Sequence, residues 1–264
     1  APCGGAGGGG EGDDGARLVD AGEAVGREGV DRGGGTASGG WRGNGRHLRR
    51  GDVLPAAAQR LVERDQGRGQ GKRGLEALLP CLDDVARLRI AVFRDWPYLY
   101  DGDVGYEREY LAAYAQSPNS VVVLARAGDK VVGASTGIPL AEDSAEFQAP
   151  FLERGIEVAK VFYCGESVLL PAYRGRGIGH AFFDAREAHA RALGGFEWTA
   201  FAAVDREDDD VRKPSDHRGN EAFWGKRGYV RQPGMTMRLH WNELDHGEVG
   251  HTRTFWLRPL EETT

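Results

Sequence analysis

The segment Pro171–His180, PAYRGRGIGH, combines glycine and arginine at a spacing suited to anion binding. Glycines at 175, 177 and 179 would let the backbone approach a ligand closely, because they lack a Cβ atom. The segment follows an apolar run, 168–170, that predicts a strand, and it leads into 181–188, whose apolar spacing predicts a helix. The free N–H groups of the first helical turn would then point at an anion, with the positive end of the helix dipole behind them. The sequence therefore predicts a phosphate-binding loop.

Two common glycine-rich phosphate signatures do not fit this loop. A dinucleotide fingerprint needs a further glycine where this chain has His180, and a P-loop needs Gly-Lys followed by Ser or Thr. What remains is Arg174-x-x-Gly177-x-Gly179 between a strand and a helix. This pattern resembles the pyrophosphate-binding loop of the GNAT family of N-acetyltransferases, which bind acetyl-coenzyme A. An ordinary strand-to-helix turn is the alternative.

The resemblance implies a set of coenzyme contacts. In that family the strand before the loop diverges from its neighbour, and its backbone binds the pantetheine arm and the thioester carbonyl. The amides of the loop would hold the pyrophosphate, and the arginine side chains would add positive charge. By position, the contacts are Leu169, Leu170, Arg174, Gly175, Arg176, Gly177, Ile178, Gly179 and His180.

Acetyl transfer to an amine also needs a group that accepts the proton of the amine. Period-two alternation places Glu166 on the same strand face as Val168 and Leu170, so that a carboxyl group would lie among apolar neighbours. A desolvated carboxylate accepts a proton more readily than one in water. We therefore predict Glu166 as the catalytic base, with a structural carboxylate as the alternative. The same alternation places Cys164 on that face, where we expect a buried core thiol.

The group that protonates the departing thiolate is not evident. In the GNAT family it is usually a tyrosine four residues before the glycine of a C-terminal Gly-aromatic pair. Here the pair is Gly228-Tyr229, and the matching position holds Trp224, whose indole cannot act as that acid. His217 takes the place of a frequent asparagine, and Asn220 follows three residues later. We expect Trp224 to pack against the coenzyme arm, with plain core packing as the alternative.

Aromatic and acidic residues gather between the first two predicted helices. In the GNAT fold this loop borders the acceptor pocket, and π faces with a carboxylate suit a cationic amine. The predicted substrate-binding residues are Trp96, Tyr98, Tyr100 and Asp101. Packing of the loop itself is the alternative.

The expected elements follow the order of the GNAT fold from about residue 75 to 244. They are helices in 75–96 and 106–114, a hairpin of 120–127 and 131–140, a helix in 142–155, a strand at 160–170, a helix at 177–193, a strand at 196–204, a short helix at 220–227 and one or two strands in 229–243. This predicts an α/β layered protein with a mixed central sheet flanked by helices. The strand that usually opens the fold has no counterpart in 67–74, and 246–260 is expected to form an extra strand or a lid.

Composition separates residues 1–74 from a single domain at 75–264. The first segment holds 23 of the 41 glycines and has Trp41 as its only aromatic residue, so it offers little to offset the entropy of ordering. We expect it to be disordered, or to be non-native sequence of the kind that a GC-rich gene gives when read upstream of its start or out of frame. An RNA-binding tail is the alternative, although its acidic residues nearly cancel its positive charge.

Charge and hydropathy exclude several partners. Residues 75–264 carry 22 Lys and Arg against 30 Asp and Glu, which suits neither nucleic acid nor an anionic membrane surface. No apolar run predicts a membrane span or a signal peptide. Cys3, Cys81 and Cys164 have no metal or disulfide spacing.

These observations predict a cytoplasmic N-acetyltransferase that uses acetyl-CoA and no metal. The acceptor would be a small-molecule amine or an exposed amino group that attacks the thioester directly. A homodimer is an open option for its assembly. A non-catalytic acyl-CoA-binding or regulatory module on the same fold is the alternative.

Overall fold

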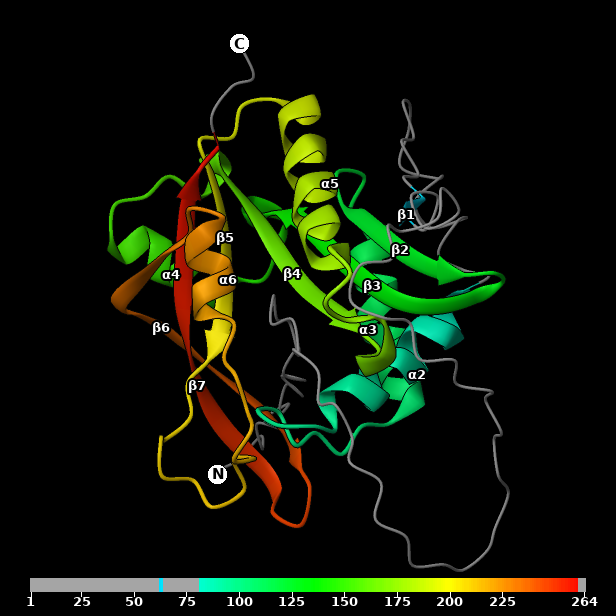
Figure 1. Cartoon of the computed structure of the whole chain (residues 1–264). Helices are drawn as coiled ribbons and strands as arrows, with labels where there is room; N and C mark the ends of the chain where they lie inside the picture. The colour runs from blue at the N-terminus through cyan, green and yellow to red at the C-terminus, as the bar shows by residue number, and fades with distance from the viewer. Residues whose placement is uncertain (1–61, 64–80, 261–264) are drawn as a thin grey trace, which may run out of the picture.

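A seven-stranded sheet forms the centre of the protein (Figure 1). The computed structural model describes residues 62–63 and 81–260. The strand order is β1-β2-β3-β4-β5-β7-β6, and only the β4–β5 pair is parallel. The strands are β1 (Val62–Glu63), β2 (Val121–Ala127), β3 (Lys130–Pro139), β4 (Val161–Leu169), β5 (Trp198–Val204), β6 (Val230–Glu243) and β7 (Gly247–Pro259). The mixed α/β architecture predicted from the sequence is confirmed.

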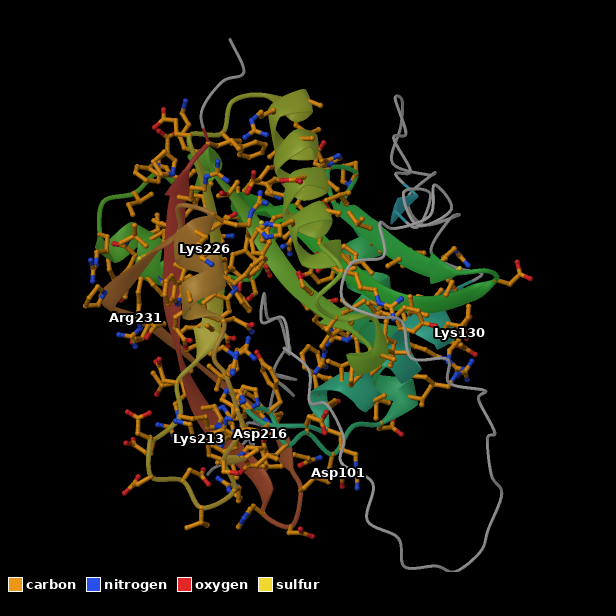
Figure 2. The ribbon with its side chains drawn as sticks, in the orientation of Figure 1. Asp101, Lys130, Lys213, Asp216, Lys226 and Arg231 are labelled. Carbon is orange, nitrogen blue, oxygen red and sulfur yellow. The ribbon has the colours of Figure 1, made fainter. Side chains whose placement is uncertain are left out.

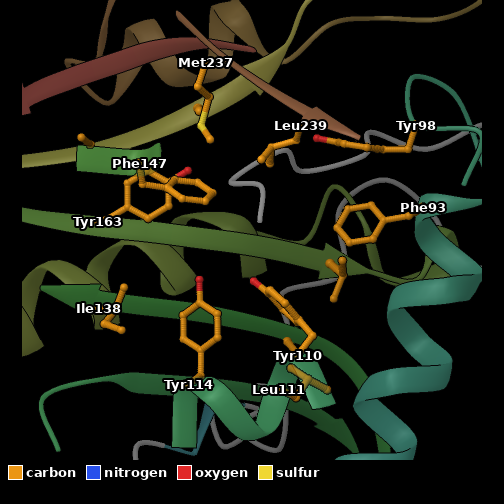
Figure 3. Close-up of a cluster of buried hydrophobic side chains, with 14 of the residues drawn as sticks. Phe93, Tyr98, Tyr110, Leu111, Tyr114, Ile138, Phe147, Tyr163, Met237 and Leu239 are labelled. Carbon is orange, nitrogen blue, oxygen red and sulfur yellow. The ribbon is translucent and has the colours of Figure 1, made fainter. Parts of the chain in front are cut away.

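Helices cover both faces of this sheet. They are α2 (Leu82–Phe93), α3 (Val104–Gln116), α4 (Ala145–Glu153), α5 (Ile178–Leu193) and α6 (Glu221–Lys226). The largest buried cluster joins α2, α3 and α4 to one face, while α5 and α6 pack on the other face (Figure 1). Figure 3 shows the first of these clusters, in which Tyr110 and Tyr114 rise from α3 toward the sheet. None of the described helices is long and apolar enough to cross a membrane.

One edge of the sheet has a strand that was not predicted, and the C-terminal tail adds a strand that was. The two-residue strand β1 lies upstream of 67–74 and pairs antiparallel with β2, so an edge strand is present that the sequence pattern did not predict. Otherwise the expectations for residues 1–74 fall outside the described residues. At the other end, the tail forms β7, which lies between β5 and β6. The strand alternative for 246–260 is therefore confirmed, and this strand belongs to the central sheet.

A β-bulge interrupts the pairing of β3 with β4. Ser135 pairs with Ser167 and Gly137 pairs with Cys164, so β4 has one more residue than β3 between these two points. The extra residue reverses the alternation of side chains along β4. Before the bulge, Cys164 packs with the cluster on the α5 face, whereas Glu166, after the bulge, contacts α2 and α3. The prediction that the two share a face is wrong for this reason.

Candidate active site

The loop between β4 and α5 has the conformation that its glycines predicted. Gly175 and Gly177 have φ values of +72° and +79°, which side chains with a Cβ rarely adopt. A Cβ atom at either position would meet nothing within 4 Å, so the backbone conformation rather than crowding requires glycine. Gly177 is the residue before α5, and no side-chain hydrogen bond caps the helix there. The first-turn amides of a 16-residue helix thus lack a side-chain cap at the predicted anion site.

The two arginines of the loop bind the loop itself. Nε of Arg174 donates to the carbonyl of Leu169 at 3.0 Å and so braces the loop against the end of β4. Nη2 of Arg176 donates to the carbonyl of Ala172 at 2.8 Å, and its guanidinium lies over the ring of Tyr173. Their predicted contact with pyrophosphate stays a prediction.

Strand β4 leaves β5 after about a third of its length. The two strands pair only from Val161 to Tyr163, opposite Trp198 to Ala200, while β4 stays paired with β3 as far as Leu169. Residues 164–169 of β4 therefore have no ladder partner on the β5 side. Figure 1 shows the two strands diverging toward the glycine loop.

The backbone N–H groups of Leu169 and Leu170, which were predicted to contact the coenzyme, point to opposite edges of β4. The N–H of Leu170 donates to the carbonyl of Val132 at 2.9 Å, so this N–H is bound to the neighbouring strand β3. This N–H is therefore occupied by a hydrogen bond within the sheet, and the predicted contact of Leu170 with the coenzyme stays a prediction. In an antiparallel ladder the next pair, Gly133 with Leu169, is then a non-hydrogen-bonded pair, and the N–H of Leu169 points toward β5.

Glu166 is fully buried in a charged environment. Its Oε2 atom lies 2.8 Å from Nη1 of Arg89 and accepts a hydrogen bond from the hydroxyl of Tyr110 at 3.1 Å. Nε of Arg89 donates to Glu107, so that one buried guanidinium bridges two carboxylates. The expectation of apolar neighbours for Glu166 is wrong, because the face of α2 that packs on β4 carries an arginine. Oε1 of Glu166 has no hydrogen-bond partner among the residues that the structure describes.

Electrostatics keeps the partners of Glu166 in their usual protonation states. Burial works against the charge of Arg89, but the carboxylates of Glu107 and Glu166 outweigh it and raise the pKa of the guanidinium above its ordinary value. Burial, with the nearby Glu166, also raises the pKa of Tyr110 above its ordinary value. Arg89 therefore stays charged, and Tyr110 stays able to donate.

The model of the acetyltransferase (GNAT) family matches residues 82–213, which is half of the chain. The chain belongs to this family. It is accordingly an acetyltransferase. The glycine loop, strands β4 and β5 and helix α5 all lie inside the matched range. No curated protein sequence matches the chain significantly.

Solved structures of GNAT acetyltransferases are similar to this chain at low identity. One is an aminoglycoside 6'-N-acetyltransferase complexed with coenzyme A, with 14% identity, coverage of 77% of this chain and 98% of that chain, and a TM-score of 0.47. Another is a ribosomal-protein-alanine N-acetyltransferase from Brucella melitensis, with 14% identity, coverage of 75% and 99%, and a TM-score of 0.43. The family assignment depends on the family model and not on these likenesses.

Trp224, at the position where GNAT enzymes usually have tyrosine, is buried in an aromatic cluster. Its ring lies 5.0 Å from that of Phe201 on β5 and 5.1 Å from that of Trp256 on β7. The indole Nε1 has no hydrogen-bond partner among the described residues. These contacts are those of the packing alternative, and the predicted contact with the coenzyme arm stays a prediction.

The four predicted acceptor residues of this GNAT chain do not converge. Trp96, Tyr98 and Tyr100 are buried, and the ring of Tyr98 packs against those of Phe93 and Trp241. Figure 3 shows Phe93 and Tyr98 in this cluster. Asp101 instead lies on the surface, 3.5 Å from Arg94 (Figure 2). The structure thus separates the carboxylate from the rings, and the loop packing that was the alternative accounts for the aromatic residues. Their role in substrate binding stays a prediction.

Residues far away in the sequence hold the loop at residues 97–101 in place. Arg206 donates to the carbonyls of Pro97 and Tyr98 at 2.6 and 3.1 Å, and it also binds Glu243 on β6. Trp241 Nε1 donates to the same Tyr98 carbonyl at 3.0 Å. Two backbone bonds join residues 99–101 to residues 242–244. No sequence motif marks these contacts, because the residues that bind the loop are more than a hundred positions away from it.

Proposed function

We propose that this acetyltransferase moves an acetyl group from acetyl-CoA to an amine by direct attack of the amine on the thioester. The observation that carries the proposal is the uncapped N-terminus of α5 behind two positive-φ glycines, at the point where β4 has left β5. Pyrophosphate suits such a helix end, because backbone N–H groups and the helix dipole both favour an anion.

The pantetheine arm would lie along the part of β4 that does not pair with β5, on the edge that faces β5. The N–H of Leu169 points toward β5, and it would donate to a carbonyl of the bound arm or to the thioester oxygen. A donor on the oxygen lowers the barrier, since negative charge develops there as the amine attacks.

Glu166 would accept the proton that the attacking amine loses, directly or through a water molecule. The C–N bond forms as the C–S bond breaks, and the departing thiolate takes a proton from water, because Trp224 cannot supply one. The carboxylate faces α2 and α3, so the amine would approach from that side of β4. The partial support for this role is that Oε1 of Glu166 has no donor among the described residues.

The experiment that tests the proposal is turnover. The protein is mixed with acetyl-CoA and a panel of small amines and peptides with free amino groups, while thiol release and acetylated product are measured. Amine-dependent release of thiol with a matching acetylated product supports the proposal. Tight binding of acetyl-CoA without turnover on the panel would favour the non-catalytic acyl-CoA-binding module, which the absent tyrosine keeps in view. The cytoplasmic location, the lack of a metal and the homodimer stay predictions from the sequence.

A further inference from the structure

Arg186, in the middle of α5, is fully buried against the bulge of β4. Its Nη1 atom donates to the carbonyl oxygens of Thr136 and Glu166, each at 3.3 Å. These two residues lie in the stretch that the bulge leaves outside the β3–β4 register. A buried carbonyl without a donor is costly, so the guanidinium replaces hydrogen bonds that the sheet cannot make there.

The bulge coincides with the point where β4 leaves β5. Pairing with β5 ends at Tyr163, and residues 165 and 166, which have no register partner on β3, follow two positions later. A bulge bends the strand that carries it and increases its twist. A bend of this kind would turn the following backbone, up to Leu169, away from β5.

Arg186 has no carboxylate within ion-pair distance among the described residues, unlike Arg227 and Arg258, which both bind Glu187. The Nε and Nη2 atoms of Arg186 have no hydrogen-bond partner among the residues that the structure describes. The guanidinium lies over the ring of Phe183, 4.5 Å from its centre. A buried arginine held by backbone carbonyls and one aromatic ring, without a carboxylate partner, contributes little to stability, since methionine of similar volume would pack without desolvating a charge.

We propose that Arg186 is a positioning residue for the coenzyme: it holds the bulge that turns β4 from β5, and so sets the backbone of residues 167–169 where the pantetheine arm would bind. This inference rests on the proposed function. It concerns the arm and not the pyrophosphate, which would bind two helical turns away at the start of α5.

Two ligands separate these parts of the coenzyme. Acetyl-CoA has both the pyrophosphate and the pantetheine arm, whereas 3′-phosphoadenosine 5′-diphosphate has the pyrophosphate alone. In Arg186→Met we expect the Kd of acetyl-CoA, measured by titration calorimetry on the full chain, to rise about tenfold or more, as expected when charge-assisted hydrogen bonds are lost. The Kd of the arm-less ligand should stay within about twofold of the wild type, because the helix N-terminus is unchanged.

Matched variants isolate the effect. Arg191→Met removes an arginine from the same helix that pairs with Glu187 at 3.8 Å, and both Kd values should stay as in the wild type. Gly177→Glu should weaken both ligands, because it blocks the shared anion site. If the wild type binds neither ligand, the proposed function fails. If the wild type binds both and Arg186→Met weakens both equally or neither, the inference about Arg186 is overturned and the proposed function stands.

Arg186→Lys covers the case in which the methionine variant does not fold. Lysine keeps the charge but cannot reach both carbonyls as the guanidinium does. We expect a rise of about threefold in the Kd of acetyl-CoA alone, and faster hydrogen exchange in peptides of residues 164–170 than in those of β7. Unchanged acetyl-CoA binding with unchanged exchange in this variant would overturn the proposal.

Discussion

Nη1 of Arg89 lies 2.8 Å from Oε2 of Glu166, and neither side chain is exposed to solvent. The same guanidinium binds Glu107, so α2, α3 and β4 meet at one buried cation. Removing one partner of a buried ion pair usually costs about 3–5 kcal/mol, because a charge is left uncompensated. Here a second carboxylate remains, so removing either one alone should cost less than that range.

Neutralising the two carboxylates in turn distinguishes catalysis from structure. We expect Glu166→Gln and Glu107→Gln to lower the free energy of unfolding by similar amounts, because each removes one charge from Arg89. Acetyl transfer should fall by roughly 10² to 10⁴ in Glu166→Gln, which cannot take a proton, and by less than about tenfold in Glu107→Gln. Denaturant unfolding and steady-state rates on the same preparations measure both effects. Equal losses of rate would assign Glu166 a structural role.

The glycine loop predicts a second result. Gly177→Glu should abolish the rise in melting temperature that acetyl-CoA causes, because a carboxylate would occupy and repel the site of the pyrophosphate. Gly155→Glu is the matched control: Gly155 also has a positive φ, +68°, and open space around it, but it lies after α4. Thermal unfolding with and without acetyl-CoA should show the ligand effect in the control alone. A preserved shift in Gly177→Glu would place the coenzyme elsewhere.

Substitution of Trp224 tests whether its indole packs against the pantetheine arm of the coenzyme. Trp224→Phe should cost roughly 1–2 kcal/mol of stability through the smaller ring, and it should weaken acetyl-CoA several-fold if the indole packs against the arm as predicted. Trp256→Phe changes the same aromatic cluster from β7 and should leave the affinity unchanged. The two dissociation constants, measured side by side, give the answer. Equal affinities in the two variants would leave Trp224 as core packing only.

His251 predicts a pH dependence of stability. Its pKa is lowered to about 4, first by burial and then by the positive charge of Arg206, with Glu243 opposing. The unfolded chain binds the proton with a pKa near 6.5, so stability is fully present above that pH and is lost as the pH falls toward 4. The loss is up to about 3 kcal/mol at about 1.4 kcal/mol per pH unit. His251→Phe keeps a ring beside Trp241 and should flatten urea-unfolding stability between pH 5 and 7. Parallel profiles for the two proteins would contradict the assignment.

Local patterns were enough to predict the strand, glycine loop and helix at residues 161–193, although coenzyme binding by the loop stays a prediction. Gly175 and Gly177 are required by the backbone conformation, and the adjacent strand and helix show their own periodicity, so the geometry is written within about twenty consecutive residues. The order of elements was predictable for the same reason.

The surroundings of Glu166 were not predictable in this way. Alternation along β4 holds on each side of the bulge but changes phase across it, so a single extra residue puts Cys164 and Glu166 on opposite faces. Arg89 lies on the buried side of α2 between residues that read as an ordinary apolar face. Its partners Glu107 and Glu166 come from other elements, and such pairing over long sequence distance leaves no local signal.

The side chains of Arg206 and Trp241 join the loop at residues 97–101 to strand β6. Backbone hydrogen bonds between residues 99–101 and residues 242–244 join the same two segments. Residues 242–244 begin after the end of the family match at residue 213. A chimera that exchanges the loop with that of another acetyltransferase would therefore need both the residue at position 206 and the β6–β7 hairpin from the same donor, because the loop depends on hydrogen bonds from both.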